Sequence, residues 1–358
     1  MLLENSIYLQ QLSAAVNHFN HFYEIRQRTI LVTGAGGMLG SCIVDLLLYL
    51  NKHRDFGIQI YAAGRNIGRL KKRFGGYCDR SYFHTVELDV SGEQRLDISV
   101  DYVIHAASNA DPFQFAKDPV GTLLANVIGV KNMLELAGTC HAQRVLYVSS
   151  GEMYGQADDT VVDGFCEGYC GSVDYGDVRS CYPAGKRAAE VLCQSYIWQY
   201  GLDAVIVRPC HCYGPTMTDT DSRALSQFFR KASKGEDIVL KSSGEAVRSH
   251  CYAVDAASGM LTVLLRGRCG EAYNIADPAS VASIKEVAEL IARVAGQRVC
   301  FATPDNMEKQ GFSKVNQAVL NSEKIFALGW KPLVNLREGV EDTLSILSEN
   351  KTENTQSE

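Results

Sequence analysis

A run of glycines directly after an apolar strand sets the strongest limit on what this chain can fold into. Residues 29–32 read Thr-Ile-Leu-Val, and Gly34, Gly37 and Gly40 follow in the spacing GxxGxxG. The apolar residues from Met38 to Leu50 then recur at helical spacing. A glycine turn between a strand and a helix lets a diphosphate approach the backbone at the helix N-terminus. The pattern predicts a dinucleotide-binding βαβ unit, in which Gly34 makes the tight turn, Gly37 admits the pyrophosphate and Gly40 packs helix on strand.

The alternation of strands and helices continues along the chain. We expect further strands at residues 58–63, 82–88, 102–105, 144–148 and 204–207, and helices at 119–137 and 183–200. These strands are almost continuously apolar, as strands covered on both faces are. The predicted fold class is therefore α/β, a Rossmann doubly wound parallel sheet with a smaller C-terminal α/β lobe.

The 358 residues divide into four predicted regions. Residues 1–27 form a helical extension, with a helix at 6–23, that serves packing or oligomer contact. Residues 28–212 are mainly the nucleotide-binding domain, and residues 213–350 are mainly a substrate-binding lobe interleaved with it. In that lobe we expect helices at 222–232, 255–265 and 283–295 and strands at 238–240 and 272–275. Residues 351–358 are polar and terminal, which predicts a disordered tail.

Composition argues against several classes of function. The net charge is −6 and no run of Lys and Arg occurs, so we expect no nucleic-acid partner. No stretch approaches about 18 uninterrupted apolar residues, and no basic leader precedes an apolar run, so we expect no membrane span and a cytoplasmic protein. The 12 cysteines include no CxxC pair, which favours free thiols. Alternation along a strand would separate His211 from Cys210 and Cys212, so we expect no metal site.

The end of the second strand bears on the choice between NAD and NADP. It reads Gly64-Arg65-Asn66, without the acidic residue that pairs with a free ribose 2′-hydroxyl. Arg65 is placed for a 2′-phosphate, or else it only begins a solvated helix, and both interpretations stay open. Asp89 and Val90, after the third strand, are expected to hold the adenine.

A candidate catalytic group lies at the start of the 183–200 helix. Tyr182 and Lys186 are four residues apart and therefore share one helix face. A nearby ammonium group favours tyrosinate, which can then act as a base. The strand at 144–148 ends close to a hydroxyl, Ser150, and a carboxylate, Glu152.

With these motifs, the chain resembles the extended short-chain dehydrogenase/reductase family, in particular its nucleotide-sugar epimerases, dehydratases and decarboxylases. The resemblance extends from Thr29 to about Asn350, and its further marks are His105–Ser108, Asn126, Arg208–Pro209, Tyr213–Pro215 and Leu328–Pro332. It implies a homodimer and a role in polysaccharide or glycan synthesis. The implied contacts to NAD or NADP are Gly34, Gly37, Met38, Leu39, Gly40, Arg65, Asp89, Val90, Ala106, Ala107, Ser108, Asn126, Tyr182, Lys186 and Pro209.

The resemblance also implies a chemistry, in which hydride transfer to bound NAD(P) makes a transient keto sugar. Tyr182 would take the hydroxyl proton, Lys186 would hold the nicotinamide ribose, and Ser150 would bond the reacting oxygen. Dehydratases of the family carry an Asp-Glu pair where this chain has Gly151 and Glu152. The nearest resemblance is therefore to UDP-glucuronate decarboxylases, with the 4-epimerases beside them.

The expected contacts to a nucleotide-diphosphate sugar are Asn109, His211, Arg223 and Arg248. Guanidinium groups suit diphosphate oxygens. His211 stands where the relatives have Asn, and the other interpretation is an ordinary strand-end histidine. Asn109 and Thr122 either line the cleft or cap helices. Two other functions stay open, an NADPH-dependent reductase of a nucleotide-linked keto sugar, which Arg65 motivates, and a catalytically silent dinucleotide sensor.

Overall fold

The seven strands of the larger sheet are parallel, so the loops that follow them lie together at one edge of the sheet. The computed structural model describes residues 2–93, 96–157, 164–305, 309, 312–313 and 315–355. Its 7-stranded sheet is parallel throughout and has the order β10-β6-β5-β4-β1-β2-β3. The strands are β1 (Thr29–Thr33), β2 (Gln59–Gly64), β3 (Phe83–Glu87), β4 (Tyr102–His105), β5 (Arg144–Val148), β6 (Ala204–Pro209) and β10 (Ala272–Ile275). The order reverses between β1 and β4, where open α/β sheets bind ligands.

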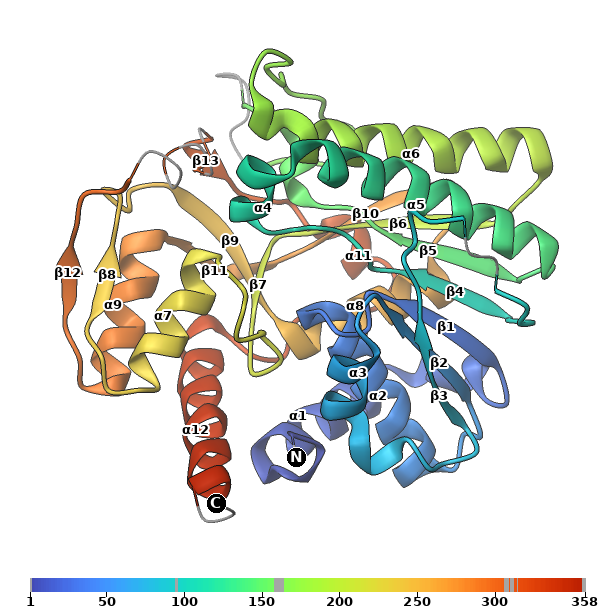
Figure 1. Cartoon of the computed structure of the whole chain (residues 1–358), viewed down its shortest axis with the longest axis horizontal. Coiled ribbons are helices and arrows are strands. Elements are labelled where there is room, and N and C mark those ends of the chain that lie inside the picture. The colour runs from blue at the N-terminus through green and yellow to red at the C-terminus, as the bar shows by residue number, and fades with distance from the viewer. Residues whose placement is uncertain are drawn as a thin grey trace.

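Helices cover both faces of this sheet, because its strands are apolar on both sides. Ile30 and Val32 of β1 pack into one core with α1, α2, α3 and α8, whereas Leu31 packs into another with α5 and α6. Figure 1 shows α5 and α6 along one side of the sheet and α2 and α3 along the other. The helices are α1 (Ser6–His18), α2 (Met38–Arg54), α3 (Ile67–Phe74), α4 (Pro112–Lys117), α5 (Pro119–Thr139), α6 (Cys181–Tyr200) and α8 (Ala253–Arg266). Short 3₁₀ turns are η1 (Leu2–Glu4), η2 (Asn20–Ile25), η3 (Gly75–Tyr77), η4 (Gly151–Tyr154) and η5 (Val178–Ser180).

A smaller lobe holds two further sheets. One is a 4-stranded sheet in which β9 pairs with β7, β11 and β13, and the other pairs β8 with β12. Its strands are β7 (His211–Tyr213), β8 (Ile238–Leu240), β9 (Val247–Tyr252), β11 (Asp277–Ser283), β12 (Val299–Phe301) and β13 (Gln317–Ala318), and its helices are α7 (Ala224–Ala232), α9 (Ile284–Ala295), α11 (Glu323–Phe326) and α12 (Leu336–Thr355). Since α8 and β10 return to the large sheet, the two parts interleave in sequence. The predicted α/β Rossmann class is confirmed.

The N-terminal extension is part of the core. Its first helix ends at His18, and the turn η2 follows, so the single helix expected at 6–23 is wrong in its last five residues. The hydroxyl of Tyr8 donates to the buried carboxylate of Asp45 in α2 at 2.7 Å. Tyr252, at the end of β9, donates to Gln11 at 2.8 Å. The extension therefore joins the nucleotide-binding layer to the smaller lobe.

The tail expected at 351–358 needs a correction. Helix α12 continues to Thr355, so residues 351–355 are helical, and residues 356–358 lie outside the described residues. Lys351 and Glu353 are good helix formers, and neither Gly nor Pro interrupts the segment. A polar sequence alone therefore did not end this helix.

Helix α5 is long and apolar enough to cross a membrane by length and composition alone. In this fold it lies over the sheet, with Val130, Met133 and Leu134 buried against β4 and β5. Its opposite face carries the exposed residues Leu123 and Leu124. The helix is a core element of the α/β layer with one apolar face left open.

Candidate active site

The glycine turn is built for close approach of the backbone. Gly34 has φ +71°, and a Cβ there would lie 2.6 Å from the Ala106 carbonyl oxygen and 2.7 Å from the Ala107 nitrogen. A Cβ on Gly40 would overlap the Gly34 carbonyl oxygen. Gly37 caps α2, whose first turn carries Met38 and Leu39 and presents free amide groups. The loop therefore fits a dinucleotide pyrophosphate at the helix N-terminus.

The loop after β4 meets helix α5 beside the glycine turn. The Ser108 hydroxyl donates to Asn126 Oδ1 at 2.9 Å, and the Asn126 amide donates to the Thr122 carbonyl at 2.9 Å. Thr122 lies inside α5, which Asp118 caps, so the alternative of a Thr122 cap is wrong. Its buried hydroxyl has no partner among the described residues. The loop residues 106–108 and Asn126 thus lie beside the glycine turn, where cofactor contacts were expected.

Positive charge lies at the end of β2. The Arg65 guanidinium donates to Asn109 at 2.9 Å. Helix α3 begins two residues later, after its cap Asn66, so Arg65 precedes that helix. Hydrogen bonds from Ser91, with a smaller effect of Arg65, lower the pKa of Asp89. Asn109, expected to contact substrate, therefore lies against Arg65 at the cofactor end and is absent from the pocket lining given below.

Tyr182 and Lys186 lie together in the buried face of α6. The Lys186 ammonium is 5.6 Å from the centre of the Tyr182 ring and donates to the Val148 carbonyl at 2.9 Å. Burial lowers the pKa of Lys186 to about 7. Burial, and next the charge of Glu152, raise the pKa of Tyr182, while a hydrogen bond with Ser150 lowers it. These surroundings favour the protonated phenol, and the expected effect of a Lys186 ammonium on the Tyr182 pKa does not appear.

The segment after β5 supplies the other two expected catalytic groups. Ser150 caps η4, and its hydroxyl accepts a hydrogen bond from the Glu152 amide at 3.1 Å. The Glu152 carboxylate accepts one from Arg179 at 2.9 Å. Pro209 ends β6 beside this turn, since a Cβ on Gly151 would lie 3.4 Å from its carbonyl oxygen. The four expected catalytic residues thus come from two elements that meet at the carboxyl edge of the sheet.

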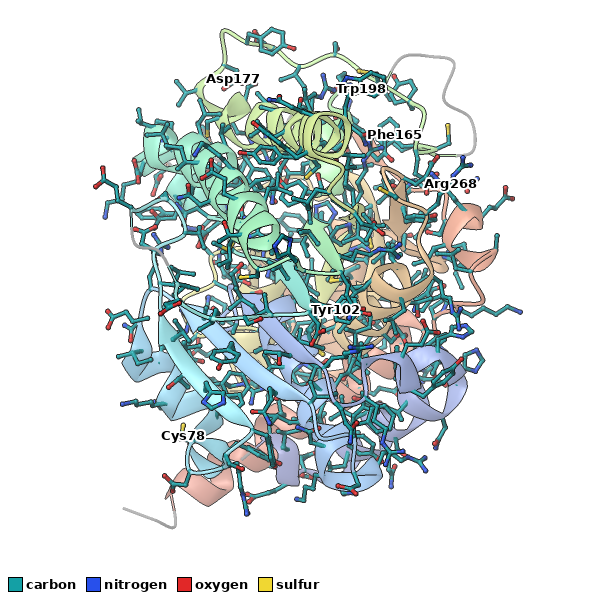
Figure 2. All side chains as sticks on the ribbon, turned by 90° about the vertical axis from the view of Figure 1, so that its right-hand side faces the viewer. Cys78, Tyr102, Phe165, Asp177, Trp198 and Arg268 are labelled. Atoms are coloured by element: carbon teal, nitrogen blue, oxygen red, sulfur yellow. The ribbon has the colours of Figure 1, made fainter. Side chains whose placement is uncertain are left out.

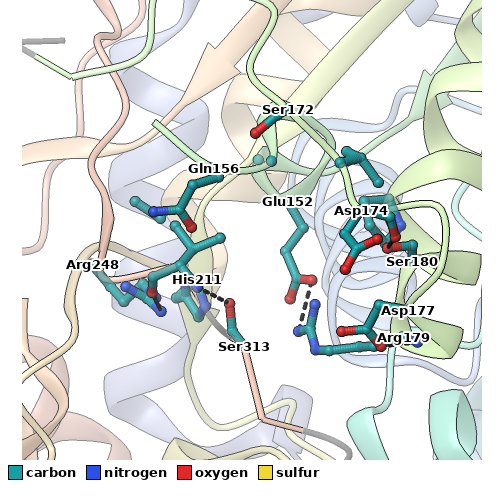
Figure 3. A pocket seen from close by; sticks show the side chains of 16 residues that line it. Glu152, Gln156, Ser172, Asp174, Asp177, Arg179, Ser180, His211, Arg248 and Ser313 are labelled. Atoms are coloured by element: carbon teal, nitrogen blue, oxygen red, sulfur yellow. Dashed lines mark hydrogen bonds and ion pairs between the residues drawn. The ribbon is translucent and has the colours of Figure 1, made fainter. Parts of the chain in front are cut away.

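A cavity of about 300 Å³ opens at this edge. Figure 3 shows Glu152 and Arg179 on one side of it and His211 and Arg248 on the other. Burial, and next the charge of Arg248, hold the pKa of His211 well below its usual value. The buried Nδ1 of His211 has no partner among the described residues. A neutral imidazole therefore faces the cavity and can exchange a hydrogen bond with a ligand.

The two arginines expected at the substrate differ in their surroundings. Arg248 lines the cavity, is buried and donates to the carbonyl groups of Val315 and Asn316. Burial lowers the pKa of Arg248, the charge of Glu152 opposes this effect, and Arg248 forms no salt bridge with the described residues. The Arg223 guanidinium instead donates three hydrogen bonds to the Asp221 carboxylate, two at 3.0 Å and one at 2.5 Å, and its Nη2 lies 3.7 Å from the Met38 sulfur. It therefore stands beside the glycine turn and is not part of the cavity lining.

Two residues near the catalytic groups escaped the sequence analysis. Arg179, in η5, contacts Glu152, and the ring of Phe115, in α4, stacks on Tyr182 with centres 4.6 Å apart. Arg179 is three residues before Tyr182, so its closeness in sequence could have marked it as a neighbour of the site. Phe115 is far from Tyr182 in sequence, and no motif marks it. Among the described residues no group of His, Cys, Asp and Glu could hold a metal ion.

Comparisons with known proteins agree with this geometry. Residues 30–276 match the model of the NAD dependent epimerase/dehydratase family. UDP-glucuronic acid decarboxylase 6 of Arabidopsis thaliana is 35% identical over 89% of this chain and 88% of that protein. The chain belongs to the NAD-dependent epimerase/dehydratase family. The expected resemblance is confirmed, and this family member is an enzyme whose reaction the comparisons leave open.

Solved structures share the fold of this epimerase/dehydratase family member. UDP-glucuronic acid 4-epimerase from Bacillus cereus, in complex with UDP-glucuronic acid and NAD, aligns with a TM-score of 0.75 over 90% of this chain and 99% of that one, at 20% identity. dTDP-glucose 4,6-dehydratase from Bacillus anthracis, in complex with NAD, aligns with a TM-score of 0.74 over 91% and 98%, at 22% identity. At these identities the likeness establishes the fold.

Proposed function

We propose that this enzyme decarboxylates a UDP-linked uronic acid, UDP-glucuronic acid, through a transient 4-keto sugar. Several relatives similar over most of the chain are UDP-glucuronic acid decarboxylases, which supports this choice. NAD, held by the glycine turn and the Tyr182 helix, would supply a reversible hydride acceptor for C4 of the sugar. The C6 carboxylate then lies β to a ketone, the arrangement from which CO₂ leaves readily.

The residues of α6 and η4 then divide the proton work. As the phenolate, Tyr182 takes the C4 hydroxyl proton as the hydride leaves and returns it at the end. Loss of CO₂ puts negative charge on the C4 oxygen, where the Tyr182 and Ser150 hydroxyls donate hydrogen bonds. One proton from water replaces CO₂ at C5, and Glu152, the carboxylate beside Ser150, is the group that can take up this proton and pass it on. The products are CO₂ and a UDP-linked pentose.

The surroundings of Gly151 carry the choice of reaction. Dehydration needs an acid to protonate the departing hydroxyl, and the related dehydratases place an Asp at this position. Here Gly151 carries no acid, and a Cβ at this position would lie 3.0 Å from the end of the Leu320 side chain, which would have to shift. Loss of CO₂ needs no proton on the leaving group. The single carboxylate Glu152, without a second acid at Gly151, therefore favours decarboxylation.

The buried charge of Arg248 points to an anionic ligand. A buried cation without a carboxylate partner is costly, and an anion beside it removes much of that cost. Arg248 donates only to backbone carbonyl groups in the described hydrogen bonds. The sugar diphosphate is the substrate group that we assign to Arg248, and His211 is assigned to a sugar hydroxyl.

A second candidate function rests on the β2 end of the cofactor site. Arg65 lies there without an acidic neighbour from β2, and the Arg69 side chain passes 3.8 Å from the Cβ position of Gly36. Two guanidinium groups suit a ribose 2′-phosphate. They favour, as the alternative, an NADPH-dependent reductase of a nucleotide-linked keto sugar.

The test has two parts. Mass spectrometry of the small molecules released on denaturing fresh protein should find stoichiometric NAD, and UDP-glucuronic acid should then yield CO₂ and a UDP-pentose. Tyr182→Phe should abolish CO₂ release, because the C4 hydroxyl loses its base. Bound NADP(H), together with consumption of NADPH by keto sugars and no CO₂, would replace the proposal by the reductase. Nucleotide binding without any change of cofactor redox state would favour the silent sensor.

We further propose a homodimer, a cytoplasmic location and a role in polysaccharide or glycan synthesis. All the cysteines in the structure are free, which suits a reducing compartment. The open apolar face of α5 and α6 supports the dimer, and its test is given in the Discussion. UDP-sugars are activated donors, which supports the synthetic role.

A further inference from the structure

Arg179 is a charged group in the cavity wall to which the reaction above gives no task. It lies in η5, three residues before Tyr182. The Asp177 side chain accepts a hydrogen bond from the Arg179 amide at 2.9 Å, which fixes the point where the side chain leaves the backbone. The Arg179 side chain is 12% exposed, so its guanidinium is largely withdrawn from water.

The guanidinium group contacts both halves of the catalytic apparatus. Its Nη2 donates to Glu152 Oε2 at 2.9 Å. Its central carbon lies 5.6 Å from the centre of the Phe115 ring, and that ring stacks on Tyr182 at 19°. A cation over an aromatic face is attracted to it, and stacked rings restrict each other's rotation. One side chain thus links the Glu152 carboxylate to the plane of the Tyr182 phenol.

Charge gives this link a second effect. Glu152 opposes ionisation of Tyr182, whereas Arg179 favours it. Without Arg179, less positive charge would offset the effect of Glu152 on the pKa of Tyr182, and the hydrogen bond that orients the Glu152 carboxylate would be lost. A guanidinium group is planar and can donate two hydrogen bonds to one carboxylate, so it can fix the orientation of that carboxylate while it stacks on an aromatic ring.

We propose that Arg179 is a positioning residue that holds Glu152 against the cavity wall and, through Phe115, sets the ring plane of Tyr182. The inference deepens the function proposed above and rests on it for the role of Glu152. The hydride step alone is enough to test it, because Tyr182 takes part in that step whatever the product. Arg187 provides a contrast within α6, since its guanidinium donates to backbone carbonyl groups of Met153, Tyr154 and Gly171 and so only anchors loops.

A double-mutant cycle tests the link. Arg179→Gln, Glu152→Gln and the double variant are compared with the wild type as NAD-bound holoenzymes given UDP-glucuronic acid. Reduced nicotinamide, followed by its near-ultraviolet absorbance, reports the hydride step, and CO₂ release reports the later one. We expect Arg179→Gln to lower kcat by about 100-fold, on the scale of one proton-transfer group, with KM changed by less than about twofold. In the Glu152→Gln background the same change should cost about tenfold, because only the link through Phe115 is then left to lose.

Two further variants separate positioning from simple stability. Arg179→Lys keeps a charge for Glu152 without the planar stack, so it should recover about a tenth of the wild-type kcat. Arg298→Gln removes an arginine from an exposed ion pair with Asp237, at 3.2 Å, and serves as the matched control with unchanged kcat. Arg298 and Asp237 lie directly before β12 and β8, in the smaller lobe. The unfolding temperature of each variant, with NAD bound, checks that the fold is intact.

The outcomes separate the two proposals. If Arg179→Gln raises KM while kcat stays, or lowers kcat equally with and without Glu152, the positioning role is overturned. If the wild type forms reduced nicotinamide but releases no CO₂, decarboxylation fails and the cycle still runs on the hydride signal. If no sugar reduces the cofactor, the same cycle measured on the free energy of unfolding decides, and additive effects there overturn the link.

Discussion

Lys186 is a buried amine whose surroundings favour its neutral form. Its side chain lies under Tyr147 and Tyr182, with one hydrogen bond to the Val148 carbonyl. Burial lowers its pKa from 10.5 to about 7 in the folded chain. Between those two pH values the unfolded chain binds a proton that the folded chain does not, so the free energy of unfolding rises with pH. Below about pH 7 the folded protein carries the full penalty of a buried charge.

The first prediction follows from this shift. Relative to the wild type, Lys186→Met should be most favourable to stability below about pH 7, and the difference should shrink by up to about 1.4 kcal/mol per pH unit as the pH rises toward 10.5. Denaturant unfolding at a series of pH values measures it. Loss of the bond to Val148 adds an offset that does not depend on pH. Lys131→Met, which removes a lysine from a half-exposed ion pair with Glu135, is the matched surface control. A pH-independent difference for Lys186→Met would contradict the shift.

At the residue scale, the sequence predicts those site residues whose spacing is set by one element or by one strand end. Tyr182 and Lys186 share a helix face, and Ser150 and Glu152 follow a buried strand. Site residues that come from other elements reach the site only in the folded chain, so no local sequence pattern predicts them. Phe115 reaches Tyr182 from α4, and Asn109 is drawn to Arg65 and away from the cavity.

Among the elements, the junction of β1 and α2 tolerates the least change. Gly40 lies in the first turn of α2, where a Cβ would overlap the Gly34 carbonyl oxygen and lie 2.7 Å from the Gly34 carbonyl carbon. We predict that Gly40→Ala destabilises the protein by about 1–3 kcal/mol, as overpacking does, and weakens NAD binding because the helix N-terminus shifts. Thermal unfolding and NAD titration measure the two effects. Gly75→Ala, which would meet nothing within 4 Å, is the matched control. Equal behaviour of the two variants would refute the packing argument.

Elements with a regular apolar pattern are predicted well, and those made by tertiary contact are not. The bounds of β4, β5, β8 and β10 are those expected from the sequence. Strand β9 reads Val-Arg-Ser-His-Cys-Tyr, in which polar side chains are buried because β7, β11 and β13 pair with it. Because of these polar residues, the alternation of apolar and polar positions does not predict β9. The strand nevertheless holds Arg248 and His250, the residue that pairs with His211.

At the scale of the whole molecule, the chain ends hold the two parts together. The side chain of Asn5 donates to Glu349 in α12 at 2.6 Å, and Gln11 donates to Asp342 at 2.6 Å. Figure 1 shows α1 and the end of α12 side by side below the sheets. The cavity lies between the two parts, so these contacts limit how far its walls can separate. Contacts between segments more than 300 residues apart follow from assembly of the fold, and no local pattern predicts them.

The outer surface of α5 and α6 bears on assembly. Exposed apolar residues gather there, and Figure 2 labels Trp198, which is 92% exposed. Val191 lies two helical turns before Trp198 on the same stripe of α6 and is 64% exposed. Leu123 and Leu124 of α5 are also exposed. Large apolar residues exposed along two neighbouring helices are typical of an interaction site.

We predict a homodimer in which this face of α5 and α6 meets its copy. Val191→Glu would place two carboxylates near each other across a two-fold axis, with no water to solvate them, so it should give a monomer. Sedimentation velocity at micromolar concentration, with light scattering as a check, measures the mass. Phe301→Glu changes another exposed apolar residue, in β12, and should leave the dimer intact. A monomeric wild type, or a dimer that Phe301→Glu breaks and Val191→Glu does not, would assign the interface elsewhere.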